Sequence, residues 1–210
     1  MTTSLPKLTG TSLLTGTLIA FGAIILHPSG GDTNHILTIH HVLTASHAII
    51  ILSLPLLLFG FSGLSMVLSS PGKISNFGLI MMGFSLIAAM FAAVLNGISQ
   101  PRFIQENHLE NPHSLSMIGS LISAISAPLT FIFIAMSSLS VFVFSLSLIK
   151  LSKYCQVLGY FGMAILTLIL FSHLAGLTLA YLLSFQIFVI LFLAWSFFCA
   201  ILLITGKIKE

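Results

Sequence analysis

About 50 consecutive residues, from Tyr154 to Thr205, contain no charged side chain. A soluble domain carries roughly a quarter charged residues, whereas only 5% of this whole chain is charged and 57% is hydrophobic. Because so few charges cannot cover a surface that faces water, lipid must surround most of the chain. Lipid permits only helices or a closed barrel to span it. Unbroken apolar runs such as Ile187–Ile204 favour helices, since barrel strands alternate apolar and polar residues.

Six segments are long and apolar enough to cross a bilayer, which needs about 20 residues per helix. They are residues 11–26, 45–68, 74–97, 120–149, 157–177 and 185–205. We therefore predict one transmembrane domain over residues 1–210, in an all-α integral membrane protein folded as a compact bundle of six helices. The first segment resembles a signal sequence, but no small-residue cleavage motif follows it, so we expect an uncleaved span.

Prolines and glycines mark the expected ends and irregularities of these spans. We expect the third span to end before Pro101, and the turn between the fifth and sixth spans to lie within Gly176–Ser184. Pro55 and Pro128 lie inside the two longest segments, where a proline should kink or divide a helix. Each of these segments is long enough to begin outside the hydrocarbon or to include a short interfacial helix.

The basic residues lie almost entirely on one side of this topology. With the N-terminus inside, Arg102 lies outside, beside Asp32, Glu106 and Glu110. The inner side holds Lys7, Lys73, Lys150, Lys153, Lys207 and Lys209. Cytoplasmic loops of membrane proteins carry such an excess of basic residues, so we predict that both termini are cytoplasmic. The asymmetry suits a bacterial plasma (inner) membrane, and lysines scattered singly give no sign of nucleic-acid binding.

All the histidines fall on the predicted outer side. They are His27, His35, His40, His41, His47, His108, His113 and His173. Counted from the inner ends at about 1.5 Å per residue, His27, His47, Asn96 and His173 reach a similar depth on four different helices. Polar side chains at one depth on separate helices are what a metal or cofactor site in a bundle requires.

Imidazole binds zinc, copper, iron and haem through a neutral nitrogen. His47 and His173 are the first candidate ligands, because an ionisable group within an apolar span is costly and usually functional. His40 and His113, which begin the two longest segments, are the next candidates. The residues that could orient these imidazoles or complete an ion site are Asn96, Asp32, Glu106 and Glu110.

Simpler interpretations exist for most polar residues. The histidines interpreted as amphipathic residues of the interface or outer loops are His27, His35, His41 and His108. For His47 and His173, a hydrogen-bonded structural role is an equal alternative. Cys155 and Cys199 are interpreted as small packing residues, and Trp195, predicted in mid-span, as facing protein or a cofactor. Frequent glycines, alanines and serines are interpreted as helix-packing residues.

Three functions are compatible with these features. The leading hypothesis is a membrane-embedded redox protein that binds haem b or a transition metal near the outer face and takes electrons from a quinol or a membrane redox partner. The second is a cation or proton transporter, which is disfavoured because the inner halves of the spans carry serines and Asn76 but no charged side chain. The third is an accessory subunit that packs against a larger membrane complex.

Overall fold

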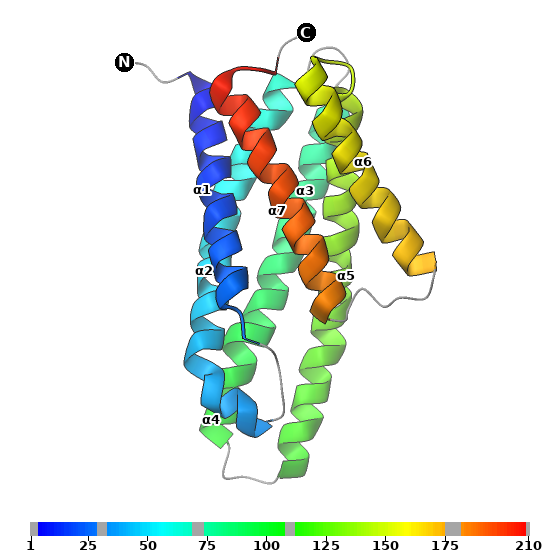
Figure 1. Ribbon diagram of the computed structural model, residues 1–210. Coiled ribbons are helices and arrows are strands. Elements are labelled where there is room, and N and C mark those ends of the chain that lie inside the picture. Colours follow the sequence, from blue (N-terminus) through cyan, green and yellow to red (C-terminus); the bar gives the residue numbers. More distant parts are fainter. Residues whose placement is uncertain (1–3, 29–32, 69–73, 108–111, 175–181, 209–210) are drawn as a thin grey trace.

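The computed structural model describes residues 4–28, 33–68, 74–107, 112–174 and 182–208. Six helical stretches are long and apolar enough to cross a membrane, which confirms the predicted all-helical class with six helices that could span a membrane. The helices are α1 (Leu5–Leu26), α2 (Thr33–Val67), α3 (Ile74–Ala93), η1 (Val94–Ser99), α4 (Gln100–Asn107), α5 (Pro112–Leu148), α6 (Lys153–Leu174) and α7 (Leu182–Thr205). The start of α1 and the end of α7 lie at the same end of the bundle (Figure 1).

The helix of the third predicted span does not end before Pro101 but continues to Asn107, so the predicted helix end was wrong. α3 continues into η1, a π-helical segment, and then into α4. Together they form one continuous helix. In an α-helix a proline ring clashes with the carbonyl four residues earlier. A π turn is wider, because its hydrogen bonds span five residues. This turn ends at Ser99, two residues before Pro101, where its wider geometry accommodates the ring.

The other two internal prolines do not divide their helices either. α2 continues through Pro55 and α5 through Pro128. Neither segment therefore contains a separate interfacial helix within its described part. Prolines are tolerated in membrane helices because neighbouring helices and serine or threonine side chains satisfy the freed backbone groups.

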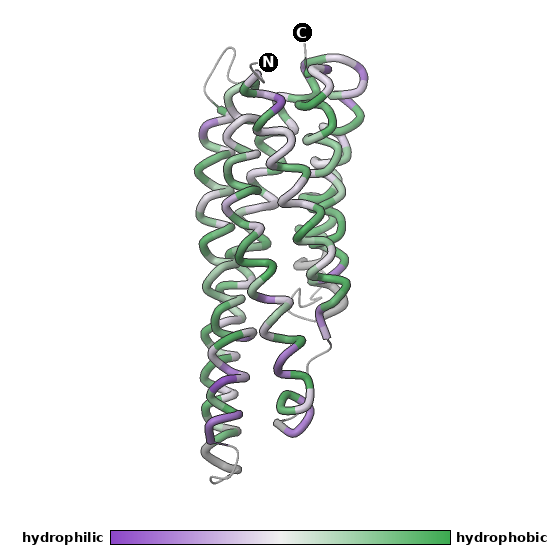
Figure 2. The backbone as a smooth tube through the Cα atoms, turned by 90° about the vertical axis from the view of Figure 1, so that its left-hand side faces the viewer, coloured by the Kyte–Doolittle hydropathy of each residue, from purple (hydrophilic) through white to green (hydrophobic). Residues whose placement is uncertain are grey.

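The helices differ in length, and this divides the bundle into two tiers. α1, with 22 residues, is about 33 Å long, close to the roughly 30 Å of a bilayer core. α2, with 35 residues, and α5, with 37, are each more than about 50 Å long. In Figure 1 the parts of α2, α4 and α5 furthest from the termini extend beyond α1, α6 and α7. Hydrophilic stretches gather toward the two ends (Figure 2).

Small residues bring α1 and α2 into close contact. A Cβ atom placed on Gly60 would overlap Leu13, and one placed on Gly63 would overlap the side chain of Thr9. Ser12 adds a hydrogen bond between the helices, donating its hydroxyl to the carbonyl of Leu56 over 2.9 Å. Close approach through small residues is a general mode of helix association in lipid, as the glycine and serine content predicted.

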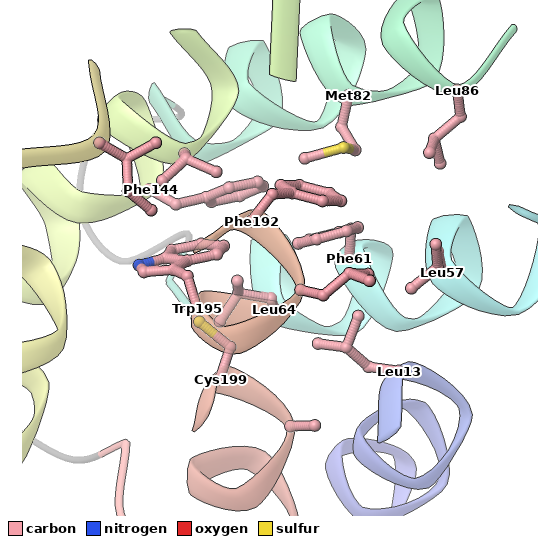
Figure 3. Packing of buried hydrophobic residues seen from close by; sticks show 14 of the residues in the cluster. Leu13, Leu57, Phe61, Leu64, Met82, Leu86, Phe144, Phe192, Trp195 and Cys199 are labelled. Atoms are coloured by element: carbon pink, nitrogen blue, oxygen red, sulfur yellow. The ribbon is translucent and has the colours of Figure 1, made fainter. Parts of the chain in front are cut away.

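The centre of the upper tier, nearer the termini, is an aromatic cluster. Phe61, Phe144, Phe192 and Trp195 stack with ring centroids 6.1–6.4 Å apart (Figure 3). Trp195 is fully buried and donates its indole N–H to the carbonyl of Leu158 over 3.2 Å. It therefore faces protein, as one of the two sequence interpretations proposed. Cys155 and Cys199 are likewise buried, with free thiols, which agrees with their interpretation as packing residues.

Candidate functional site

His27 and His47 meet at the level where the short helix α1 ends. His27 caps the C-terminus of α1, and His47 lies on α2, seven residues beyond His40. The two imidazole rings lie 4.8 Å apart between centroids and are tilted by 57°. His47 is only 7% exposed, and His27 is half-buried. We call these two residues the imidazole pair.

A backbone hydrogen bond fixes the tautomer of His47. Its Nδ1 lies 2.8 Å from the carbonyl oxygen of Leu43, one turn earlier in α2. A carbonyl can only accept, so Nδ1 carries the proton and donates it. In the neutral ring the lone pair then resides on Nε2. This arrangement, with one ring nitrogen tied to a backbone carbonyl, is the one that metal-binding histidines commonly adopt.

His27 is suited to remain neutral at physiological pH. Burial lowers the pKa of its imidazole below the usual 6.5, an effect larger than the opposing one of its hydrogen bonds to the backbone of Pro28 and of His27 itself. A neutral imidazole is the form that binds a metal ion, because the ion and the proton compete for the same lone pair.

Gly97 provides the space that His47 occupies. It is a buried residue of the π-helical segment η1, and a Cβ atom placed on it would overlap the His47 ring. The absence of a side chain at this position therefore lets the ring lie directly on the helix backbone. π turns inside α-helices are frequent at functional sites. Asn96, predicted to lie at this depth, is the neighbouring residue of the same turn and is half-buried.

His40 lies on the same side of α2, further from the termini. Its Nδ1 is 2.7 Å from the carbonyl oxygen of Leu37, so this nitrogen also carries the proton. Its Nε2 is buried and has no hydrogen-bond partner among the described residues. Around this level α2 and α4 share a small apolar core of Ile36, Leu43 and Ile104. The ring of His41 lies against that of His40, with centroids 3.8 Å apart.

His173 and His113 lie on α6 and α5, and their role beside His47 stays a prediction. His173 lies at the end of α6, and the described part of α6 packs against α5 and α7, on the far side of the bundle from α1 and α2 (Figure 1). His113 lies in the first turn of α5. The side chains of both lie outside the described part of the chain, so their roles as ligands stay predictions. The pair that forms is His47 with His27.

The predicted supporting carboxylates have different positions. Glu106 is exposed on α4 and forms an ion pair with Arg102, with 2.8 Å between Oε1 and Nε. Asp32 and Glu110 lie outside the described residues. Within the described ranges, no three histidine, cysteine, aspartate or glutamate side chains gather closely enough to hold a metal ion. An ion at the imidazole pair would therefore need ligands beyond these two rings.

The sequence pattern favoured an interfacial position for His27 over a ligand role. It gave no prediction that Gly97 would lie against a histidine ring. The depth count placed His27 level with His47, but its position at a helix end also suited an ordinary interfacial residue. For Gly97 the available signal was a glycine next to Asn96, four residues after the small-residue run of α3. Only the pairing of η1 with α2 shows that this glycine lies against a histidine.

Comparison of the chain with protein-family models, with curated proteins and with solved structures finds no match. The geometry of the imidazole pair is therefore the basis for assigning a function.

Proposed function

We propose that this chain is a membrane-embedded protein that binds a transition-metal ion at His27 and His47, and that it serves redox chemistry through that ion. The observation that carries the proposal is the imidazole pair itself. Its ring centroids lie 4.8 Å apart, and the Nδ1–H of His47 donates to the carbonyl oxygen of Leu43. Imidazole suits zinc, copper, iron and nickel. Among these, copper or iron would allow one-electron exchange with a quinol or a membrane partner.

The ring separation favours a bare ion over haem at this pair. A metal lies about 2.0–2.1 Å from an imidazole nitrogen, and therefore about 3.2 Å from the ring centroid. Two rings at a tetrahedral angle then have centroids roughly 5 Å apart, close to the observed 4.8 Å. Two imidazoles that bind a haem iron from opposite sides have ring centroids more than about 6 Å apart. Haem binding through His40, His113 or His173 remains a separate proposal.

The location of the pair supports a site near the outer face. All the described lysines, Lys7, Lys150, Lys153 and Lys207, lie toward the opposite end of the bundle, at the helix ends near the termini. By the positive-inside rule we propose that this lysine-bearing end is cytoplasmic and that the membrane is a bacterial plasma membrane. The imidazole pair would then lie near the outer limit of the hydrocarbon.

The test is metal binding by detergent-purified protein. We would analyse its metal content, record oxidised and dithionite-reduced absorption spectra, and titrate the metal-free protein with Cu²⁺ and Co²⁺. We expect one tight site in the wild type that is lost in His47→Ala and in His27→Ala. His27 is half-buried at a helix end, so its replacement disturbs the fold less. The matched control is His41→Ala, since His41 is exposed on the same helix as His47.

Retention of the tight site in both pair variants would contradict the proposal. A sharp reduced band of b-type haem would assign the cofactor to other histidines. A colourless protein that binds no metal would instead favour the accessory-subunit function.

A further inference from the structure

The opposite end of the bundle has a distinct basic surface, independent of the imidazole pair. Lys150 and Lys153 flank the short turn between α5 and α6, and both side chains are exposed. Lys207, also exposed, lies just after α7. None of the three forms a salt bridge within the described part of the chain, where Glu106, at the other end of the bundle, is the one acidic residue.

The end of α7 directs Lys207 onto this turn. Gly206 adopts a left-handed conformation, with φ of 64°. The amide of Gly206 then donates to the carbonyl of Leu203, and that of Lys207 to the carbonyl of Leu202. This is the Schellman arrangement, in which a glycine ends a helix and reverses the chain. The reversal carries residue 207 away from the axis of α7.

Contacts with α6 hold the reversed chain in place. The Ser152 hydroxyl donates to the carbonyl of Lys207 over 3.4 Å, and the Cys155 thiol lies 3.7 Å from the same oxygen. The ammonium group of Lys207 lies 5.0 Å above the centroid of the Tyr154 ring, within the range of a cation–π interaction. Tyr154 itself is 67% exposed. Lys207 and Tyr154 thus lie together beside the turn that carries Lys150 and Lys153.

We propose that Lys150, Lys153, Lys207 and Tyr154 bind the phosphate headgroup of an anionic phospholipid. These residues lie at the ends of membrane-spanning helices, which is the level of the headgroups. Lysine side chains there extend along apolar surface and place their ammonium groups in the polar layer, and tyrosine is enriched at the same level. Basic clusters between helix ends on the cytoplasmic side are a recognised mode of anionic lipid binding.

The test is headgroup selectivity of the full chain in an uncharged detergent. Native mass spectrometry would follow titration with dihexanoyl phosphatidylglycerol and, separately, dihexanoyl phosphatidylcholine. We expect phosphatidylglycerol to bind more tightly than phosphatidylcholine. Each Lys→Gln change at 150, 153 or 207 should weaken phosphatidylglycerol binding by about fivefold. Tyr154→Phe should retain the affinity, and Tyr154→Ala should lower it. Lys7→Gln removes an equal charge from the same end of the bundle and should change the affinity less than twofold.

Equal affinity for the two lipids would overturn the proposal. An equal loss in Lys7→Gln and Lys207→Gln would also overturn it, since the attraction would then come from overall charge rather than from this surface. Inorganic phosphate distinguishes a free anion from a headgroup. If inorganic phosphate bound as tightly as phosphatidylglycerol, the surface would be assigned to free phosphate and the lipid proposal rejected.

Discussion

Replacing Gly97 by alanine tests the contact on which the imidazole pair depends. The added Cβ would overlap both the ring and the Cβ of His47, so the ring must move together with the α2 or η1 backbone. Displacement of the ring would stretch the hydrogen bond from Nδ1 to the carbonyl of Leu43, which is 2.8 Å long in the native protein. The change therefore acts on the site through a single methyl group.

Two opposing contributions set the change in the free energy of unfolding of Gly97→Ala. Inserting a methyl group into a packed interior costs about 1–3 kcal/mol, whereas replacing glycine by alanine within a helix contributes about 0.5–1 kcal/mol of stability. The net expectation for Gly97→Ala is a loss of up to about 2.5 kcal/mol in the free energy of unfolding. Gly83, in α3, has no atom within 4 Å of the equivalent Cβ position. Gly83→Ala therefore keeps only the favourable contribution.

The assay is thermal unfolding of both variants in one detergent, together with metal titration. For a chain of this size about 1 kcal/mol corresponds to a 2–4 °C change in Tm. We expect Tm to fall by a few degrees in Gly97→Ala and to rise slightly in Gly83→Ala. A displaced ring should also weaken metal binding at the pair by about tenfold or more, since ligands must be held within about 0.5 Å. A Gly97→Ala protein with raised Tm and unchanged metal affinity would refute the reasoning.

Three further outcomes are expected. Gly60→Ala should destabilise more than Gly97→Ala, because its Cβ would meet backbone as well as side-chain atoms of Leu13, and a comparison of the two Tm values checks this. Phe144→Ala should cost about 3–5 kcal/mol by opening a cavity in the aromatic cluster, measured by denaturant unfolding. The free energy of unfolding should decline as pH falls below 6.5. The pKa of His27 is lowered in the folded chain, so in this range the unfolded chain binds a proton at His27 that the folded chain does not. Denaturant unfolding at several pH values checks this, and His27→Gln should abolish this part of the pH dependence.

The sequence by itself predicted the all-helical class and the number of helices that are long and apolar enough to span a membrane. These follow from the scarcity of charge and from the length of the apolar runs, both of which are properties of local composition. The clustering of histidines toward one end was also predictable, since each helix reverses the direction of the last and depth can be counted along it. Pro101 was misread because a π turn depends on the packing of η1 against α2 and α5, and no local signal for it was recognised.

Only the tertiary structure decided which histidines meet. Depth placed His27, His47 and His173 at one level, but depth carries no information about rotation around a helix axis or about which helices are neighbours. The close contact of α1 with α2, made through Gly60 and Gly63, brings His27 to His47, whereas the described part of α6 packs on the far side of the bundle. Lateral packing is set by the shapes of small side chains facing each other across an interface, and that complementarity exists only once the helices are assembled.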